Sequence, residues 1–357
     1  MKIAFRVDAS SKIGTGHFMR CLTLADALKQ HGAQTRFISR QMPEHLHDML
    51  DAKGHEFMPL NSGSDEVILD NLAHAHWLGV NQLADAQDSI QALSDKTWDW
   101  LVVDHYALDV RWESVLRQMA ENILVIDDIA DRQHDCDVLL DQNFYANMNN
   151  RYTDMVPAHC QLLLGPRYAL LREEFQQLRE QVKPRKGPVK RVLVFFGGVD
   201  TDNFTGRAIE ALENIGIEAL HVDVVIGAQH PHREQIESAC AKHQFDCHVQ
   251  TNRMAKLMAA ADLAIGASGS ATWERCCLGL PALTVSLADN QTKIAKSLGL
   301  LGAAQYIGSK DIASVAVIHK AILDLLQNRN QVEVLSEKAY SIVDGLGVDR
   351  LCEVLGC

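Results

Sequence analysis

Short segments of continuous apolar residues alternate with helix-periodic segments along most of this 357-residue chain. The strand candidates of the first half are Ile3–Val7, Gln34–Ser39, Trp100–Asp104, Ile123–Asp127 and Val138–Leu140. The helical segments between them include Phe18–Lys29, Gln82–Leu93 and Val110–Ala120. Strands that are apolar on both faces need a cover on both faces, and the intervening helices supply it. The pattern therefore predicts an α/β fold built on a parallel sheet.

The alternation breaks once, near the middle of the chain. Residues 141–190 are polar, contain four prolines and carry a charged helical segment at Leu170–Gln181. We predict two Rossmann-like, doubly wound domains, at residues 1–160 and 191–357, joined by a linker at 161–190. We expect them to face each other across a cleft at the carboxyl ends of their strands, where open α/β sheets bind ligands.

The second domain repeats the alternation of the first. It starts with the strand Arg191–Phe196 and reaches a last strand at Ala282–Ser286. From Gln291 to the end of the sequence we expect only helices.

The charge balance argues against one class of partner. The chain has 34 Lys and Arg residues against 46 Asp and Glu, a formal net charge of −12. Proteins whose affinity comes from neutralising nucleic-acid phosphates carry the opposite excess. A basic cluster at Lys183–Lys190 contains two prolines and is better explained as a solvated linker. We expect no nucleic-acid partner, and nothing in the sequence requires more than a monomer.

Hydropathy and cysteine usage indicate the compartment. No run of about 18 apolar residues is present, so we expect no membrane partner. Asp8 stands where a signal peptide would need its apolar region, which predicts a cytoplasmic protein. Nine cysteines, an odd number with no C-x-x-C spacing, indicate reduced thiols rather than a disulfide framework or a zinc site.

The loop after the first strand has the composition of a binding site. It contains Gly14 and Gly16, and His17 follows them where the helix begins. A dinucleotide fingerprint would need a third glycine, but that position is Met19, and no acidic residue follows the second strand at the right distance. We therefore expect no nicotinamide cofactor, and no cofactor of another kind.

His17 is the first catalytic candidate. The partial positive charge at a helix N-terminus disfavours an imidazolium, which keeps a neutral ring available as a base near pH 7. The alternative is a histidine that only forms hydrogen bonds within the loop. A position directly after G-x-G at the mouth of the predicted cleft favours the base.

Carboxylates follow two further strands of the first half. Asp104 precedes Tyr106 at the end of one strand, and Asp127 and Asp128 end the next. Paired carboxylates are also typical of a divalent metal site. Side chains of sequence neighbours at a strand end diverge, however, and capping of a following helix explains at least one of the pair. We prefer a site without a metal.

Two loops of the second half are suited to a diphosphate. Gly197 and Gly198 follow a strand and precede a helix, whose unpaired N–H groups and dipole form a candidate phosphate cradle. The segment from Gly266 to Arg275 ends a strand in small residues and begins a new helix. Glu274 lies one turn into that helix, where its carboxylate is placed either to accept from ribose hydroxyls or to interact with the helix dipole.

These motifs resemble known enzymes. The segment G-A-S-G-S-A-T-W-E with the later G-L-P-A-L and D-N-Q resembles the nucleotide-binding half of the GT-B fold, especially the UDP-N-acetylglucosamine transferase of lipid II synthesis. Residues 5–20, 103–106, 165–175 and 196–200 are similar to the UDP-2,4-diacetamido-2,4,6-trideoxy-β-L-altropyranose hydrolases of pseudaminic acid synthesis. The resemblance extends from residue 3 to about residue 300.

The resemblance implies a GT-B-like fold and a reaction. It implies cleavage of the sugar C1–O bond with inversion and release of UDP, without a metal. It also implies a step in pseudaminic acid synthesis, and thus a link to flagellin glycosylation. It also implies roles for single residues. These are His17 as general base, Tyr106 near the sugar, Gly197, Gly198, Ser268, Gly269 and Ser270 around the diphosphate, Glu274 on the ribose, Met254 by its backbone on uracil, and Asn290 on the substrate.

Three other functions remain open from the sequence. The main alternative is a GT-B glycosyltransferase that passes the sugar of a UDP-sugar to an acceptor instead of water. A UDP-sugar 2-epimerase would need further acid and base residues in the cleft. A non-catalytic protein would bind a UDP-sugar without turnover.

Overall fold

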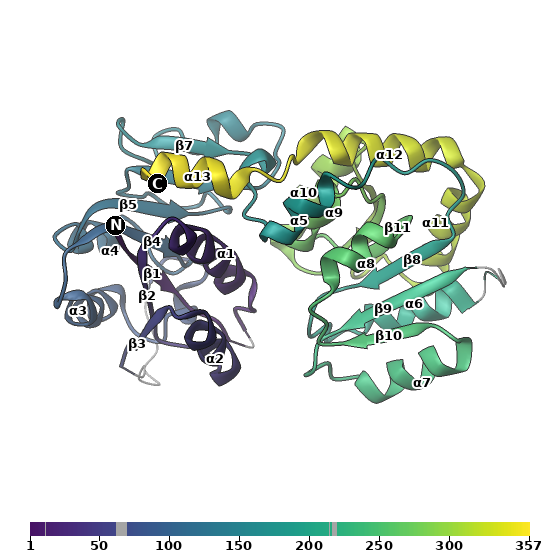
Figure 1. The fold of residues 1–357 in the computed structure, drawn as a ribbon, viewed down its shortest axis with the longest axis horizontal. Helices are drawn as coiled ribbons and strands as arrows, with labels where there is room; N and C mark the ends of the chain where they lie inside the picture. The colour runs from purple at the N-terminus through teal and green to yellow at the C-terminus, as the bar shows by residue number, and fades with distance from the viewer. Residues whose placement is uncertain (11, 62–69, 214, 216–219) are drawn as a thin grey trace. The chain divides into compact units, whose positions relative to one another are not determined.

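A computed structural model describes residues 1–10, 12–61, 70–213, 215 and 220–357. The chain forms two compact units, and each is described by itself below (Figure 1). Unit 1 consists of Met1–Asn143, Asn147–Leu170 and Gly347–Cys357, and unit 2 consists of Phe144–Ala146 and Leu171–Leu346.

Unit 1 is built on a parallel sheet of seven strands in the order β3-β2-β1-β4-β5-β6-β7. The strands are β1 (Lys2–Val7), β2 (Gln34–Ser39), β3 (Glu56–Pro59), β4 (Trp98–Asp104), β5 (Ala120–Ile126), β6 (Val138–Asp141) and β7 (Gln161–Leu164). Its helices are α1 (Gly16–Gln30), α2 (Glu44–Lys53), α3 (Gln82–Leu93), α4 (Val110–Leu116) and α13 (Gly347–Leu355), with short 3₁₀ turns at Ala75–Trp77, Met148–Asn150 and Pro166–Tyr168.

Alternate residues of these strands enter two separate cores, one on each face of the sheet. Phe5 and Val102 pack with α1, α2 and α13, and the rings of Phe5 and Phe37 stack at 4.7 Å. Leu101 and Trp112 belong to the opposite core, with α3 and α4. Burial on both faces is what makes the strands read as continuous apolar runs in the sequence.

Unit 2 is built on a second parallel sheet, in the order β10-β9-β8-β11-β12-β13. The strands are β8 (Arg191–Phe195), β9 (His221–Ile226), β10 (Asp246–Val249), β11 (Leu263–Ala267), β12 (Ala282–Ser286) and β13 (Gln305–Ser309). The helices are α5 (Glu173–Arg179), α6 (Phe204–Glu213), α7 (Arg233–His243), α8 (Met254–Ala260), α9 (Ala271–Cys277), α10 (Asp289–Leu301), α11 (Val315–Gln327) and α12 (Arg329–Ile342).

Both sheets reverse their strand order at one point. In unit 1 the order reverses between β1 and β4, and in unit 2 between β8 and β11. Connections that leave the two central strands run to opposite faces, so the loops diverge and leave a crevice at the carboxyl ends. Each unit therefore has one favoured place for a ligand. The loops after β1 and β4 line it in unit 1, and the loops after β8 and β11 line it in unit 2.

The predicted α/β class and the two parallel sheets are confirmed. Several predicted elements have the bounds that the structure shows, among them Gln34–Ser39 and Met254–Ala260. The expected helix Val110–Ala120 was too long, because α4 ends at Leu116 and Ala120 already begins β5.

The expectation of helices alone after Gln291 is wrong. Strand β13, at Gln305–Ser309, pairs with β12 at the edge of the sheet. All five of its residues are only half-buried, and it contains no continuous apolar run. An edge strand is paired on one side only, so it lacks the pattern that marks the central strands.

The domain boundaries need correction at two places. The predicted linker 161–190 contains β7, which pairs with β6 and so belongs to unit 1. Helix α13, assigned from the sequence to the second domain, returns to unit 1. Leu351 and Leu355 lie in the core with β1 and α1, and the Trp100 indole N–H donates to the Leu355 carbonyl at 3.2 Å.

None of the described helices is long and apolar enough to span a bilayer.

Truncating a buried leucine of α13 tests whether this helix contributes to the core of unit 1. Leu351→Ala is expected to destabilise unit 1 by about 2–5 kcal/mol, because Leu351 is fully buried. Four of the five tryptophans lie in unit 1, so urea unfolding followed by tryptophan fluorescence reports mainly on that unit. The exposed Glu353→Ala on the same helix serves as control. Equal stability of both variants would mean that α13 does not contribute to the core.

Candidate active site

His17 and Asp104 meet at the strand-order reversal of unit 1. His17 lies in the first turn of α1, after β1, and Asp104 is the last residue of β4. The strands are neighbours, with Val7 opposite Asp104. His17 Nδ1 lies 2.5 Å from Asp104 Oδ1, and the carboxylate can only accept, so we assign the proton to Nδ1. When the ring is neutral, Nε2 then carries the lone pair that a base needs.

Arg20 fixes the Asp104 carboxylate from the next turn of α1. Its Nε donates to Oδ2 at 2.6 Å and its Nη2 to Oδ1 at 2.7 Å. Burial alone would raise the pKa of Asp104, but the charge and hydrogen bonds of Arg20, together with the hydrogen bond from His17, more than offset this and hold that pKa well below its usual range. A permanently ionised carboxylate therefore faces His17 Nδ1.

Tyr106 closes the same cluster from the β4 side. Its ring meets the His17 ring edge-on, with centroids 4.6 Å apart. Its hydroxyl donates to Asp128, whose other oxygen accepts from Arg20 Nη1 at 2.8 Å. Burial and the Asp128 charge raise the pKa of Tyr106 well above its ordinary value, so the phenol stays protonated. The two residues singled out from sequence in this half are thus brought together.

Two aromatic residues of the site were missed by sequence reasoning. Trp77 stacks against Tyr106 at 5.5 Å, and His74 lies 4.6 Å from Trp77 and 5.2 Å from Tyr106. Both come from the 3₁₀ turn before α3, outside any strand-end motif. Only the folding of that segment onto β4 reveals them, and no sequence signal marks them. Together with His17 they form an aromatic wall.

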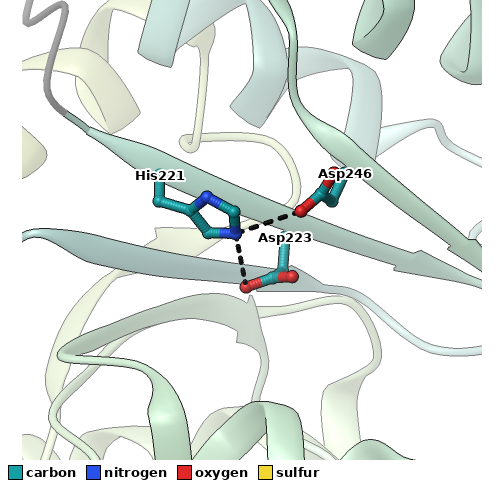
Figure 2. A group of neighbouring side chains, drawn as sticks. All are labelled: His221, Asp223 and Asp246. Atoms are coloured by element: carbon teal, nitrogen blue, oxygen red, sulfur yellow. Dashed lines mark ion pairs between the residues drawn. The ribbon is translucent and has the colours of Figure 1, made fainter.

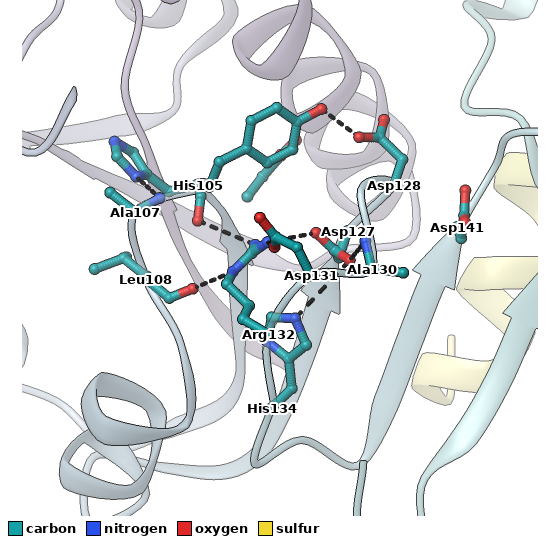
Figure 3. Close-up of polar contacts among 12 residues, drawn as sticks. His105, Ala107, Leu108, Asp127, Asp128, Ala130, Asp131, Arg132, His134 and Asp141 are labelled. Carbon is teal, nitrogen blue, oxygen red and sulfur yellow. Dashed lines mark hydrogen bonds and ion pairs between the residues drawn. The ribbon is translucent and has the colours of Figure 1, made fainter. Parts of the chain in front are cut away.

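Asp127 and Asp128, the two carboxylates that follow β5, diverge, as predicted, but neither caps a helix. Asp127 lies 2.8 Å from Arg132 Nη1 and accepts from the Ala130 backbone N–H at 2.9 Å, in a loop (Figure 3). Burial would raise the pKa of Asp127, but Arg132 and His134 outweigh it and lower the pKa to about 2. The expectation of a helix cap was wrong because the residues from 129 to 137 form no helix.

Asp141 ends β6 beside this pair and was also missed. The Tyr152 hydroxyl lies 3.0 Å from Asp127 Oδ2 and 3.1 Å from Asp141 Oδ2, and it has one proton for the two carboxyl groups. Arg151 Nε also approaches Asp141 Oδ2, at 3.1 Å. Burial and the neighbouring Asp128 charge raise the pKa of Asp141 to about 7, in spite of Arg151.

In unit 2, Gly197 and Gly198 follow β8 at the strand-order reversal. Gly197 has a φ of +111°, which only glycine adopts readily, and a Cβ at either position would meet open space. The predicted phosphate cradle at the start of α6 is wrong in one respect. Asp200 already accepts from the N–H groups of Phe204 and Thr205, at 3.0 and 2.7 Å, so these donors are engaged.

The loop after β11 lies beside the Gly197 loop, because β8 and β11 are paired. Ser268 is buried, and its hydroxyl has no hydrogen-bond partner among the described residues. Ser270 stands at the start of α9 with no side-chain cap bond, and Gly269 lies between them. A Cβ atom placed on Gly269 would lie 3.6 Å from Gln291 Nε2, so the first turn of α10 is close to this loop.

The remaining predicted residues of unit 2 come from helix starts after three strands. Glu274 lies in the first turn of α9, and Arg172 Nη2 is 3.4 Å from its Oε1. Burial raises the pKa of Glu274 more than Arg172 lowers it. Met254 is the buried first residue of α8, and Asn290 is exposed at the start of α10. All follow carboxyl ends of strands in one parallel sheet.

Comparison with known proteins gives matches in the second half and along the whole chain. Residues 191–345 match the family model of the glycosyltransferase family 28 C-terminal domain. The spore coat polysaccharide biosynthesis protein SpsG of Bacillus subtilis is 23% identical over 360 residues, covering 99% of this chain and 98% of the relative. The UDP-2,4-diacetamido-2,4,6-trideoxy-β-L-altropyranose hydrolase of Campylobacter jejuni is 26% identical over 304 residues, covering 85% and 97%.

Solved structures match both units in one alignment. MurG of Acinetobacter baumannii has a TM-score of 0.67 at 16% identity, covering 99% of each chain. UGT2 of Phytolacca americana, complexed with UDP-2fluoro-glucose and pterostilbene, has a TM-score of 0.70 at 12% identity, covering 99% and 98%. The chain has the GT-B fold. The GT-B prediction, made from the strand-end motifs of the second half, is thereby confirmed.

The raised pKa of Asp141 predicts a pH dependence for the first half of this GT-B chain. The folded state keeps the Asp141 proton up to a pKa of about 7, whereas the unfolded chain loses it near 3.8. Stability is therefore lost as the pH rises between these values, by roughly 2–3 kcal/mol from pH 5 to 8. We expect Asp141→Asn to remove this loss in urea unfolding at the two pH values.

Asp127→Asn is the matched control. The pKa of Asp127 is lowered from 3.8 to about 2, so its contribution is essentially complete from about pH 5 upward and is lost only in acid. That variant should change stability by the same amount at pH 5 and pH 8. An Asp141→Asn protein with the wild-type pH dependence would contradict the assignment.

Proposed function

We propose that this protein hydrolyses a UDP-linked 2,4-diacetamido-2,4,6-trideoxyhexose to UDP and the free sugar. The substrate we propose is UDP-2,4-diacetamido-2,4,6-trideoxy-β-L-altropyranose, in pseudaminic acid synthesis. The observation that carries the proposal is the His17–Asp104 pair at the strand-order reversal of unit 1. The name of the Campylobacter jejuni relative and the family 28 match of unit 2 support the substrate class.

In this proposal His17 activates water. Asp104 accepts from Nδ1–H and so holds the tautomer in which Nε2 takes a proton from the attacking water. The water oxygen bonds to C1 of the sugar, the C1–O bond breaks, and its electron pair leaves on UDP. Attack opposite the leaving group in a single displacement inverts the anomeric centre. Such a base contributes on the order of 10²–10⁴-fold.

Tyr106 and Trp77 would position the sugar. The Tyr106 hydroxyl already donates to Asp128, so the residue is left to contact the sugar through its ring. Trp77 stacks on that ring and extends the wall beside His17. Rigid aromatic faces hold a ligand at low entropic cost, because their own rotamers are fixed by packing.

Unit 2 would hold UDP. We propose that the loops after β8 and β11 surround the diphosphate, through Gly197, Gly198, Ser268, Gly269 and Ser270. The buried, unpartnered Ser268 hydroxyl supports this, since a ligand oxygen would satisfy it. Glu274 would accept from the ribose, the backbone of Met254 would pair with uracil, and Asn290 would contact the substrate. Preorganised donors of this kind stabilise the charge that grows on a leaving diphosphate.

The setting of the reaction belongs to the same proposal. We propose a cytoplasmic monomer that uses no metal or cofactor in catalysis and has no nucleic-acid or membrane partner. A diphosphate is already a tolerable leaving group, so the protein needs only to stabilise the charge that develops on it and to orient the attacking water.

A second candidate is a GT-B glycosyltransferase with a UDP-sugar donor. The family 28 match and the transferases among the similar structures favour it. The same His17 would then take a proton from an acceptor hydroxyl rather than from water. The two functions differ in whether turnover needs an acceptor.

An acceptor-free reaction in ¹⁸O-water with EDTA distinguishes these functions. With the proposed altropyranose substrate, we expect UDP release and one ¹⁸O atom in the sugar by mass spectrometry. UDP release only after addition of an acceptor would establish the transferase. Label in UDP would mean attack at phosphorus and would remove His17 from its proposed role.

Variants of the pair test the base directly in the same assay. His17→Ala is expected to slow turnover by about 10²–10⁴-fold and to leave UDP affinity unchanged. Asp104→Asn should also slow turnover, because an amide no longer fixes the tautomer. The exposed His47→Ala on α2 is the control and should keep wild-type turnover. Wild-type turnover in His17→Ala would end the proposal.

The ribose role of Glu274 is tested by UDP binding. Glu274→Ala is expected to weaken UDP binding about tenfold or more in calorimetry, because hydrogen bonds to a charged group contribute about 1.5–3 kcal/mol. Glu174 also contacts Arg172, at 2.8 Å, but lies on α5, so Glu174→Ala is the matched control. Equal affinities of the two variants would reduce Glu274 to a first-turn acid that interacts with the helix dipole.

A further inference from the structure

A group of histidines and carboxylates lies in unit 2 outside the candidate nucleotide site. β9 contributes His221 and Asp223, and β10 contributes Asp246 and His248. The strands are parallel, with Asp246 opposite Asp223. Alternate residues of a strand share a face, so these four side chains lie on one face of the sheet. The intervening residues, such as Val222, belong to the core on the other face.

Three of these side chains, His221, Asp223 and Asp246, converge on that face, as Figure 2 shows. His221 Nε2 lies 3.1 Å from Asp246 Oδ2 and 3.7 Å from Asp223 Oδ2. Each of the three residues offers one ligand atom, and these atoms all lie within 4.8 Å of one another.

We propose that His221, Asp223 and Asp246 bind a divalent transition-metal ion of the Zn²⁺ or Co²⁺ type. Imidazole nitrogen and carboxylate oxygen are ligands that these ions accept together. Bonds of 2.0–2.1 Å in a tetrahedral site place neighbouring ligand atoms about 3.3 Å apart. The two distances from His221 Nε2 lie on either side of that value, and the Asp223 and Asp246 ligand oxygens lie within 4.8 Å of each other, so side-chain rotations would bring the three atoms to this spacing.

Two further residues would hold the Asp223 carboxylate for the ion. His248 Nε2 lies 2.8 Å from Asp223 Oδ1, and Arg191 Nε and Nη2 donate to the two oxygens at 2.6 and 3.1 Å. Outer partners that orient a ligand in this way are a regular part of metal sites.

Arg191 also sets a limit on affinity, since its positive charge opposes a cation. Counting Asp223 and Asp246 as negative and Arg191 as positive leaves one net negative charge with neutral histidines. His221 and Asp246 are about half-exposed, so the ion would be bound at the open side of the cluster, where it would share Asp223 Oδ2 with the Arg191 guanidinium, whose Nε lies 2.6 Å from that oxygen. The competing explanation is an ion-pair cluster in which a protonated His221 takes the place of the ion.

The location indicates a structural ion rather than a catalytic one. His221 and Asp246 are the first residues of their strands, whereas the Gly197 and Ser268 loops follow the carboxyl ends of theirs. The ion would join β9 to β10, the outermost pair of the sheet, and stabilise unit 2. It is independent of the proposed reaction, whose turnover we expect to continue in EDTA.

The test uses the full chain after treatment with a chelator and titration with Co²⁺. We expect d–d absorption typical of nitrogen and oxygen ligands, without the near-ultraviolet thiolate band that binding to the nine free cysteines would give. Zn²⁺ should displace Co²⁺ and should raise the unfolding temperature of the wild type, since it binds only the folded state.

Three variants make the test specific. His221→Gln and Asp246→Asn, both half-exposed and expected to fold by circular dichroism, should each weaken Co²⁺ binding at least tenfold. His47→Gln is the control, since His47 and Asp51 form an exposed pair on α2 with Nε2 and Oδ2 3.5 Å apart. Absence of d–d absorption at about millimolar Co²⁺ would show an ion-pair cluster only. Unchanged binding in both variants, or a thiolate band, would also overturn the proposal.

Discussion

The reversal of strand order in each parallel sheet is the constraint on which the rest of this structure depends. Because the connections leave β1 and β4 toward opposite faces, the backbones of the loops that follow them diverge and leave room for side chains between them. His17, Asp104 and Tyr106 occupy the space left at that point. The same reversal between β8 and β11 puts a loop with two glycines beside a loop of serine and glycine in unit 2. The candidate site residues of both units therefore lie at the points where the strand order reverses.

Buried charge is the cost of building a site at such a point. The strand ends of unit 1 bring Asp104, Asp127 and Asp141 out of water, and each has an arginine partner: Arg20, Arg132 and Arg151. The desolvation of such pairs offsets much of their attraction, so they contribute little net stability. What they give is a fixed arrangement before any ligand arrives, which is what electrostatic catalysis requires. Asp141 is the least compensated of the three, because its carboxyl lies beside the other acids.

Central elements of the fold were readable from the sequence because each was buried on both faces. Gln34–Ser39 and Ala282–Ser286 have the bounds that were predicted. The edge strand β13 was not readable, since its residues are only half-buried and form no apolar run, whereas α13 was expected to be helical but was assigned to the wrong core, which lies far away in the sequence. Periodicity shows that a segment has an apolar face and leaves open which core receives it.

The residues of the candidate site also divide into those that the sequence predicted and those that it missed. His17 and Tyr106 lie next to strand ends, where residue type and position together carry information. Trp77 reaches the site through contacts with elements distant along the chain, which no local spacing encodes. Asp141 directly follows the predicted strand Val138–Leu140, so its strand-end position was a signal that could have found it. Asp104 and Asp128 were visible as strand-end carboxylates. Their hydrogen bonds to His17 and Tyr106, however, depend on the pairing of β1 with β4 and of β4 with β5.

The return of α13 to unit 1 has a consequence for the order of events during synthesis. Domains of a nascent chain usually fold in order from the N-terminus. Here the core of unit 1 includes Val348, Leu351 and Leu355, which the ribosome makes only after the whole of Leu171–Leu346. Unit 2 can close its sheet while unit 1 still lacks one of its helices. The half of the chain that is made first is therefore the half that is finished last.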